Sequence, residues 1–344
     1  MKDKKASHKK SFLHKLFIKL IRKFGYEVID QSNLYIPSKN LEANQNLSES
    51  GKQSINIPLG KTEITRKVKS LTIIIRSYTF GDVDDSKVML DQNKKRIFDK
   101  DKNEYTFRSL YSLLKSLNRA KKVFKNINFE IIVTDTNSDK NDLEKIKKIL
   151  SNHSISYKLI EINLNDFKNK IVGNYTKAKF ANMANLYSSL LLAKDDLSDL
   201  IYFCEDDYLH SNDAIIEMLF SYEKFSTIFK EDVFLLPSDY PYLYTKNNNT
   251  KLFIGHKKHW RLVDESLVTF MTSKKIVLNY IDNFMSMATK WDDPWEEPLH
   301  NIYKKVPCLS PIPSLAVHCS NINSVYGISP NIDWKMIWDE NDGY

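Results

Sequence analysis

Short apolar runs alternate with segments of helical periodicity between residues 70 and 205, and this alternation restricts the possible fold more than any other feature. The apolar runs are rich in β-branched residues and have the length of buried strands: Leu71–Ile75, Phe129–Thr134, Tyr157–Ile162 and Leu200–Cys204. Helical spacing occupies the intervals between them, at Phe107–Leu117, Asp142–Leu150 and Lys177–Lys194. Strands that alternate with helices predict an α/β fold with a mostly parallel sheet and crossover helices. Because ligands of such sheets bind at the carboxyl ends of the strands, residues directly after each strand are the first candidates for a site.

Glycine is too scarce for the best-known nucleotide-binding loops. The chain has eight glycines, and no two are spaced for G-x-G-x-x-G or for G-x-x-x-x-G-K-[ST]. This argues against a dinucleotide-dependent dehydrogenase and against a P-loop NTPase. A nucleotide bound to this sheet would need another way of having its phosphates neutralised.

Three consecutive acids, Glu205-Asp206-Asp207, follow the apolar run Leu200–Cys204 directly. Mg²⁺ and Mn²⁺ prefer oxygen ligands and usually bind one or two carboxylates together with substrate phosphates. The triplet therefore indicates a site for a divalent cation and a phosphorylated ligand. By itself it is also compatible with a solvated acidic turn.

Further motifs occur in the order found in the GT-A glycosyltransferases, and the chain resembles the inverting family-two type over roughly residues 70–320. The first strand leads into a polar stretch with an aromatic residue, the second ends in an Asp before a polar turn, and a helix with an Asn precedes the acidic triplet, which resembles the D-x-D element. An acidic pair and a strand ending in His follow. The segments are Ile75-Arg76-Ser77-Tyr78, Ile132–Asp139, Ala184-Asn185, Glu205-Asp206-Asp207, Trp291-Asp292-Asp293-Pro294-Trp295 and Pro311–His318.

The resemblance implies a nucleotide site at the first two strand ends. Tyr78 would stack on the base and Asp135 would accept a hydrogen bond from it. Asp206 would reach the ribose, and Asn185 belongs to the same group of residues, although it is equally suited to bridging backbone. Arg76 departs from the small hydroxyl residue common in the family, and would add a phosphate contact or alter nucleotide choice.

The resemblance also implies a metal site and a general base. Asp207 and His318 would hold Mn²⁺ or Mg²⁺ on the diphosphate, with Glu205, in place of the usual Asp, at the head of the triplet. The cation would stabilise the departing nucleotide diphosphate. Asp293, or else Asp292, would deprotonate the acceptor hydroxyl. Glu296 and Glu297 compete for this role, since acidic residues are also favoured at a helix N-terminus for structural reasons.

The function implied is transfer of a sugar from a nucleotide-diphosphate sugar, with a UDP-sugar favoured, to a hydroxyl acceptor by single displacement with inversion. The acceptor expected is a membrane-associated glycan or glycolipid of the cell envelope. Two alternatives stay open: a nucleotidyltransferase, and a non-catalytic membrane-bound module that binds sugar or nucleotide. The first usually has a basic, Gly-rich loop after the first strand, which Arg76-Ser77-Tyr78-Thr79-Phe80 matches poorly.

Aromatic residues and cysteines each allow two interpretations. The aromatic residues and Arg between the triplet and His318 favour either an acceptor pocket or the core: Tyr240–Tyr244, His259-Trp260-Arg261, Trp291 and Trp295. The three cysteines form no even disulfide set, which is typical of a reducing compartment. We expect them to be buried, the alternative being a zinc site that uses Cys319 and His318.

The formal net charge of +8 lies at one end of the chain. Residues 1–24 contain nine Lys or Arg and one Asp, so the remaining chain carries 42 basic and 42 acidic residues. A nucleic-acid enzyme would need its basic surface near its chemistry, so no nucleic-acid partner is expected.

The basic end also has helical amphipathicity. In Ser11–Phe24 the apolar residues fall on one helical face and lysines or arginines on the other, with Gly25 as a C-terminal stop. The lysines interrupt any signal-peptide core. We expect residues 9–24 to lie on an anionic membrane surface, so that the protein is cytoplasmic and peripheral on the inner face of the membrane. The alternative is a helix docked on the protein's own core. The expected organisation is an amphipathic segment over 1–37, a polar linker over 38–66, a catalytic domain over 67–320 and a C-terminal tail over 321–344.

Overall fold

The structure is a computed structural model that describes residues 12–26, 54–57, 60–79, 97–98, 100–195, 198–245, 249–319 and 324–344. Residues 9–11 and 38–53, on which parts of the expected membrane segment and linker fall, lie outside the described residues. The described end of the predicted linker contains two strands. β1 (Ser54–Ile57) pairs antiparallel with β2 (Gly60–Glu63).

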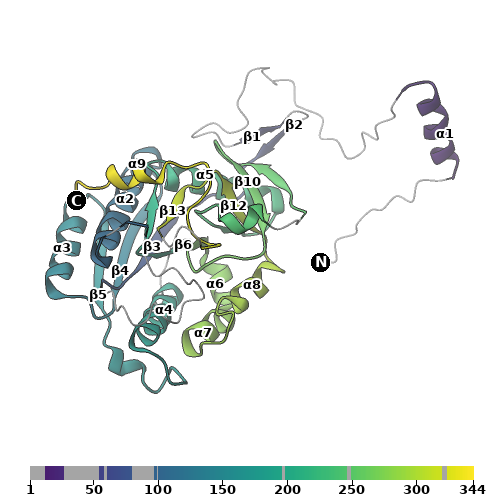
Figure 1. Cartoon of the computed structure of the whole chain (residues 1–344). Helices are drawn as coiled ribbons and strands as arrows, with labels where there is room; N and C mark the ends of the chain where they lie inside the picture. Colours follow the sequence, from purple (N-terminus) through teal and green to yellow (C-terminus); the bar gives the residue numbers. More distant parts are fainter. Residues whose placement is uncertain are drawn as a thin grey trace.

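A nine-stranded sheet forms the centre of the protein, in the order β5-β4-β3-β6-β11-β8-β12-β10-β9 (Figure 1). Its first four strands are parallel and correspond to the four apolar runs of the sequence: β5 (Ser156–Glu161), β4 (Asn128–Asp135), β3 (Ser70–Ser77) and β6 (Leu200–Glu205). The helices α2 (Lys102–Val123), α3 (Lys140–Ser151) and α4 (Lys177–Asp195) connect them, with the short 3₁₀-helix η3 (Leu164–Phe167) before α4. The expected α/β fold, a central sheet flanked by helices, is confirmed.

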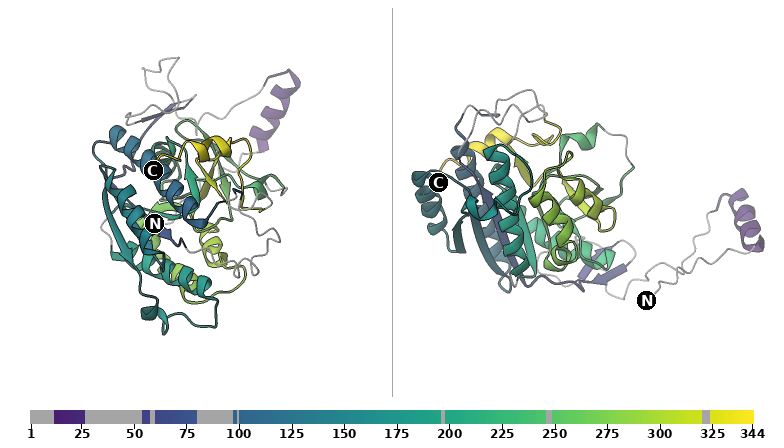
Figure 2. Two further views of the ribbon diagram at one scale, coloured as in Figure 1. Left: turned by 60° about the vertical axis from the view of Figure 1, so that its left-hand side comes forward. Right: turned by 90° about the horizontal axis from the view of Figure 1, so that it is seen from below.

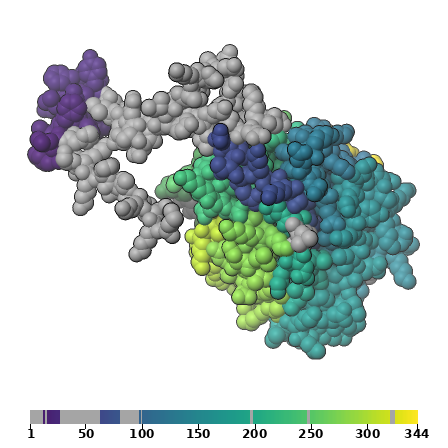
Figure 3. Space-filling model, turned by 180° about the vertical axis from the view of Figure 1, so that it is seen from behind, coloured from purple at the N-terminus to yellow at the C-terminus, as the bar shows by residue number. Residues whose placement is uncertain are grey.

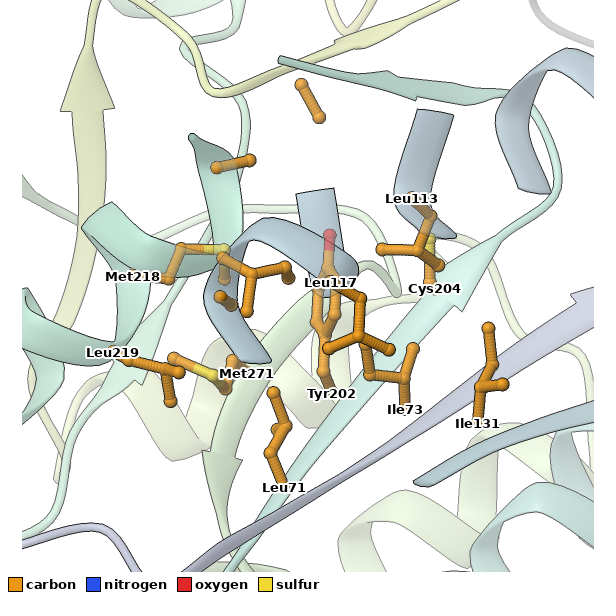
Figure 4. Close-up of a cluster of buried hydrophobic side chains, with 14 of the residues drawn as sticks. Leu71, Ile73, Leu113, Leu117, Ile131, Tyr202, Cys204, Met218, Leu219 and Met271 are labelled. Carbon is orange, nitrogen blue, oxygen red and sulfur yellow. The ribbon is translucent and has the colours of Figure 1, made fainter. Parts of the chain in front are cut away.

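The inner strands β3 and β6 are buried on both faces because helices cover both sides of the sheet (Figure 2), whereas the end strand β5 is largely exposed. Alternate residues of β3 point into different clusters. Ile73 packs with Leu113 of α2 and Met218 of α5 (Ala214–Phe229), as Figure 4 shows. Ile74 belongs to a second cluster with Leu186 of α4. Near-continuous β-branched runs are what a strand with two buried faces requires.

The second part of the sheet is mixed. β11 (Phe270–Ser273) is antiparallel to both β6 and β8 (Phe234–Leu235), so β8 runs in the direction of β6. The sheet continues through β12 (Cys308–Ile312), β10 (His259–Val263) and β9 (Leu252–Ile254). The remaining elements here are η4 (Pro241–Tyr244), α6 (Lys274–Asn279), α7 (Ile281–Thr289) and α8 (Glu297–Tyr303). As a result, the carboxyl end of β8 lies at the same edge of the sheet as the carboxyl ends of β3, β4 and β6.

A small two-stranded sheet lies at this edge. β7 (Tyr208–His210) pairs antiparallel with β13 (Ala316–His318), which brings chain segments more than a hundred residues apart into register. The C-terminal helix α9 (Trp334–Asp339) packs beside it, and Trp338 stacks on Phe98 at a centroid distance of 3.9 Å. Arg108 of α2 donates to the carbonyl of Trp338 at 2.8 Å, so the C-terminal segment is attached to α2.

The first described element, α1 (Phe12–Lys23), ends as the sequence indicates. Gly25 has a φ of +84°, its N–H donates to Arg22 O, and the N–H of Tyr26 donates to Ile21 O. This pattern is a Schellman motif, in which glycine accommodates the left-handed conformation. None of the described helices is both long enough and apolar enough to cross a membrane.

Candidate active site

The strand ends place the predicted site residues next to one another. In the parallel register Arg76 of β3 lies opposite Glu205 of β6, and Ser77 lies opposite Asp135 of β4. The acidic triplet follows β6 at the same edge. Residues that are about 60 and 130 positions apart in the sequence therefore share one surface because parallel strands end together.

Each carboxylate of the triplet has a different basic partner. Glu205 pairs with Arg76 at 2.8 Å, Asp206 pairs with Lys102 at 2.5 Å, and Asp207 lies 3.5 Å from His318. Three adjacent carboxylates at a strand end would otherwise raise one another's pKa by repulsion. The structure relieves this repulsion by three separate pairings between protein side chains.

The first pair is largely internal. The Arg76 side chain is 4% exposed, and it also donates from Nη1 to Asn182 Oδ1 at 3.1 Å, while its Nε is buried with no hydrogen-bond partner among the described residues. The other carboxylate oxygen of Glu205 accepts from the Thr269 hydroxyl at 3.2 Å. Glu205, predicted as a metal ligand, is thus occupied by protein donors on both oxygens. Arg76, predicted to contact phosphate, keeps one unused donor.

The second pair, Asp206 with Lys102, is buried and connects separate elements of the site. Asp206 and Lys102 are each about nine-tenths buried. The second oxygen of Asp206 accepts from the Thr106 hydroxyl at 2.7 Å and from the backbone N–H of Tyr78 at 3.0 Å. Asp206 thereby joins the end of β3 to the first turns of α2. The carboxylate accepts hydrogen bonds from three protein donors. Its predicted contact with ribose stays a prediction.

The third pair has the geometry of a ligand set. The antiparallel register of β7 and β13 sets His318 opposite Tyr208, whose ring stacks on the imidazole with centroids 4.7 Å apart. His318 Nδ1 lies 2.6 Å from the carbonyl oxygen of Tyr326. Because a carbonyl oxygen only accepts, Nδ1 carries a proton, and Nε2 is the nitrogen that faces Asp207. Burial alone would lower the pKa of His318, but the neighbouring Asp207 raises it above its usual value.

A divalent cation fits between Asp207 and His318. With metal–ligand bonds of about 2.0–2.2 Å, ligand atoms 3.5 Å apart would subtend about 110° at the metal. Metal-binding imidazoles usually donate from the other ring nitrogen to a carbonyl or carboxylate, as His318 does to the Tyr326 carbonyl. Within the described part of the chain, no group of three or more His, Cys, Asp or Glu side chains is arranged to hold a metal, so this pair would depend on phosphate oxygens or water for the rest of the shell.

The alternative zinc site is not supported by the structure. Cys319 is 1% exposed and packs with Leu209, Val317 and Trp338, and no metal-binding group that includes it is found among the described residues. All three cysteines are buried and none forms a disulfide, as expected of small apolar side chains.

The predicted base-binding and nucleotide residues form a buried polar network. Asp135 is 1% exposed and accepts hydrogen bonds from the hydroxyls of Ser77 and Ser138; burial raises its pKa, and these hydrogen bonds oppose the rise. Asn185 donates to the carbonyls of Thr134 at 2.9 Å and Ser77 at 3.3 Å. Asn185 therefore bridges the ends of β3 and β4, which is the structural role left open by the sequence. Tyr78, at the end of β3, is partly exposed.

The four candidate acids near α8 differ in environment. Asp292 is exposed and pairs with Lys290 at 2.9 Å, while Asp293 is exposed and accepts from Trp291 Nε1 at 3.1 Å. Glu297 is also exposed. Only Glu296 is partly buried, and its burial, together with the charges of Glu205 and Asp293, raises its pKa to about 7 although Arg76 opposes the rise.

Most of the aromatic region belongs to the core. Tyr240 and Trp260 are fully buried. Trp291 stacks on Trp295 with ring centroids 4.6 Å apart, and Lys179 Nζ lies 4.4 Å from the centroid of the Trp291 ring. For these side chains the core interpretation holds. Tyr244 differs, since it is 50% exposed.

Sequence reasoning missed Lys102, Thr106, Thr269 and Tyr326. Lys102, Thr106 and Thr269 contact the triplet from distant segments of the chain, and Tyr326 contacts His318 from the turn that follows β13. A Lys or Thr at the start of a helix carries no local sign of such a partner. No signal in a single sequence would have selected them.

No family model and no curated protein matches the sequence. Among solved structures, the chain is similar to S. aureus TarS 1-349, with 12% identity over 64% of this chain and 55% of that one and a TM-score of 0.35. UDP-glucose pyrophosphorylase complexed with UDP-glucose is 8% identical over 74% and 94% of the two chains, with a TM-score of 0.36. The galactosyltransferase LgtC with donor and acceptor sugar analogs is 11% identical over 68% and 66%, with a TM-score of 0.29.

The chain spans little more than half the length of TarS 1-349. Of the three, LgtC is named as a galactosyltransferase, and the TM-scores are all below 0.4. At such similarity no residue of a neighbour can be matched to a residue of this chain. The function is therefore inferred from the residues of the site itself.

Asp206 and Asp207 are expected to respond differently to loss of charge. Asp206→Asn should lower the free energy of unfolding by about 3 kcal/mol, because it leaves the buried Lys102 ammonium without its counter-ion. Asp207→Asn, whose side chain is 20% exposed, should change it by less than about 1 kcal/mol. Urea unfolding followed by circular dichroism measures both, and equal destabilisation by the two variants would contradict the internal role of Asp206.

Proposed function

We propose that the protein is a metal-dependent glycosyltransferase that transfers a sugar from a nucleotide-diphosphate sugar to a hydroxyl acceptor. The observation that supports this most is the different state of the three triplet acids at the ligand edge of the sheet. Glu205 and Asp206 are compensated internally, which leaves Asp207 with His318 to face a ligand. A UDP-sugar is the donor favoured by the sequence motifs.

The charge distribution suits a diphosphate carried by a cation. Arg76 pairs with Glu205, Lys102 pairs with Asp206, and His318 lies 3.5 Å from Asp207, so the three carboxylates of the triplet have different partners. A divalent cation held by Asp207 and His318 would stabilise the charge of the departing nucleotide diphosphate. Arg76, whose side chain is 4% exposed, would act on the same charge through its electric field and not by direct contact with phosphate.

Glu296 is the best-placed general base. It lies close enough to Glu205 and Arg76 for their charges to act on its pKa, and that pKa of about 7 is suited to taking a proton at neutral pH. Asp293, which the sequence motif favours, is exposed and lies beside Glu296, where its charge helps to raise the pKa of Glu296. We therefore assign proton removal from the acceptor to Glu296 and a supporting electrostatic role to Asp293. Inversion by single displacement needs only this one base and the leaving-group cation.

The metal assignment predicts a loss of metal-dependent nucleotide binding. UDP with Mn²⁺ should raise the melting temperature of the wild-type protein more than UDP alone, because a ligand that binds only the folded state stabilises it. Asp207→Ala should abolish the Mn²⁺-dependent part of this shift. Asp282→Ala, which removes an exposed acid of α7, should leave it unchanged. A full Mn²⁺-dependent shift in Asp207→Ala would show that the metal lies elsewhere.

The base assignment predicts a specific change in the pH profile. In the wild-type enzyme kcat/KM should rise with pH and level off above about pH 7, because Glu296 must lose its proton before it can accept one. Glu296→Gln should lower transfer by about 10²–10⁴-fold and remove this acidic limb, while the Mn²⁺–UDP thermal shift stays as in the wild type.

Asp293→Asn is the matched variant for this experiment. It removes a neighbouring negative charge, so the acidic limb should persist and move to slightly lower pH. If Asp293→Asn instead abolishes transfer and Glu296→Gln does not, the base is Asp293, as the motif suggests.

We further propose that α1 attaches the protein to an anionic membrane surface on the cytoplasmic side. Five apolar side chains of α1 and that of the next residue, Phe24, are more than half exposed (Figure 3, where α1 is purple), whereas Ile18 and Ile21 are partly exposed. The five are Phe12, Leu13, Leu16, Phe17 and Leu20. A helix docked on the protein's own core would bury them. An exposed apolar face beside basic residues is typical of helices that lie in a membrane interface.

The membrane proposal predicts salt-sensitive binding to vesicles. The intact chain should sediment with liposomes that contain phosphatidylglycerol, and less so at high salt, which screens the basic residues. Removal of residues 1–24 should abolish sedimentation, and so should Leu16→Asp with Leu20→Asp, which keeps every basic residue. Sedimentation that survives both changes would rule out α1 as the membrane contact.

A further inference from the structure

A second polar cluster lies at the ligand edge of the sheet, just beyond the end of β8. Asp239 is fully buried, and the guanidinium of Arg261 from β10 and the hydroxyl of Tyr244 from η4 each donate to one of its carboxylate oxygens. The Arg261 guanidinium carbon lies 4.4 Å from the centroid of the Tyr244 ring. The three side chains, named here the Asp239 cluster, come from separate elements and take no part in the metal or base assignments.

The hydrogen bonds within the Asp239 cluster leave one donor unused. Arg261 is 8% exposed, its Nη1 is 3.4 Å from the carbonyl of Leu243, and its Nε is buried without a partner among the described residues. Burying an unpaired donor is costly, so such groups in native proteins usually have a role. The charge of Arg261 is balanced by Asp239, so the Asp239 cluster has no excess charge to attract a charged ligand.

Tyr244 provides the accessible part of the cluster. Half of its surface is exposed although the guanidinium covers one face of the ring, so the exposed area belongs to the edge and the other face. The face of an aromatic ring is electron-rich and attracts polarised C–H groups. A pyranose ring offers such C–H groups on one face and neutral hydroxyl oxygens at its rim.

The Asp239 cluster is connected by direct contacts to the proposed metal ligands Asp207 and His318, named here the metal pair. Tyr240, the residue after Asp239, has its hydroxyl 2.7 Å from that of Tyr208, and the Tyr208 ring stacks on His318. Tyr240 also contacts the ring of Tyr326, whose carbonyl orients His318. The cluster and the proposed donor site are thus separated by one layer of aromatic side chains.

We infer that the Asp239 cluster is the acceptor subsite and that it binds a neutral pyranose, with Tyr244 stacked on the sugar ring and the Arg261–Asp239 ion pair holding the Tyr244 side chain in place. This inference rests on the proposed function, because only a sugar-transfer reaction requires a second sugar at this edge. It narrows the acceptor from any hydroxyl compound to one that ends in an uncharged sugar. Asp239 has a positioning role, since it holds both partners and is itself inaccessible.

Saturation-transfer NMR on the full chain tests this without any need for turnover. The probes are methyl glucoside, methyl galactoside and methyl N-acetylglucosaminide, with methyl glucuronide as the charged counterpart. At least one neutral probe should receive saturation at its ring protons from the wild-type protein. Tyr244→Phe should retain the signal, and Tyr244→Ala should weaken binding about tenfold or more, because it removes the stacking surface. Tyr157→Ala is the matched control and should behave as the wild type. It removes an exposed tyrosine of β5, the end strand of the central sheet, which takes no part in the Asp239 cluster.

The outcomes separate this inference from the proposed function. Unchanged pyranoside binding in Tyr244→Ala, tighter binding of methyl glucuronide than of methyl glucoside, or no signal from any neutral probe would each overturn the acceptor subsite. The Mn²⁺–UDP thermal shift of Tyr244→Ala should equal that of the wild type, because the donor site is built from other residues. If the wild-type protein shows neither a nucleotide shift nor donor turnover but still binds pyranosides through Tyr244, the proposed function fails and the sugar site stands.

Discussion

Three adjacent carboxylates at the end of one strand are the constraint on which this site depends. Partly buried acids at such a spacing repel one another, and each must gain a cationic partner or become protonated. The fold supplies the partners from three directions: Arg76 from the neighbouring strand, Lys102 from the first turn of α2, and His318 from a strand added more than a hundred residues later. The end of β3, the start of α2 and the β7–β13 pair are therefore held around the triplet, and a change in any one would disturb the others.

These pairings also give different surroundings to residues of the same type that are neighbours in the sequence. Asp206 is about nine-tenths buried and bound by protein donors, whereas Asp207, one position later, is more exposed and lies beside His318. A similar contrast separates Asp293, which is exposed, from Glu296, which is partly buried and has its pKa raised toward neutrality. In both cases burial and the nearest cation decide the role, more than the residue type does.

The C-terminal segment, residues 324–344, contacts residues of the candidate site. The turn around Tyr326 contributes the carbonyl that sets the tautomer of His318, and its ring packs against Tyr240 and Tyr242. Farther along, Trp338 and Asp342 bind Arg108 of α2, the helix that carries Lys102 and Thr106. The expected tail over 321–344 thus supports the metal pair directly and the Asp206 anchor through α2.

The sequence by itself determined the elements and the edge at which they act. β-branched runs alternate with helical periodicity strongly enough to locate β3 to β6 and α2 to α4 within a few residues, because local burial patterns are written into local sequence. The rule for parallel sheets then placed Arg76, Asp135 and the triplet together. Only the tertiary structure decided which acid meets which cation, that Asn185 bridges backbone, and that Tyr240 and Trp260 are core whereas Tyr244 is exposed. Those outcomes depend on contacts across 50 to more than 100 residues, where the energy of a pairing comes from burial and distance that no local pattern records.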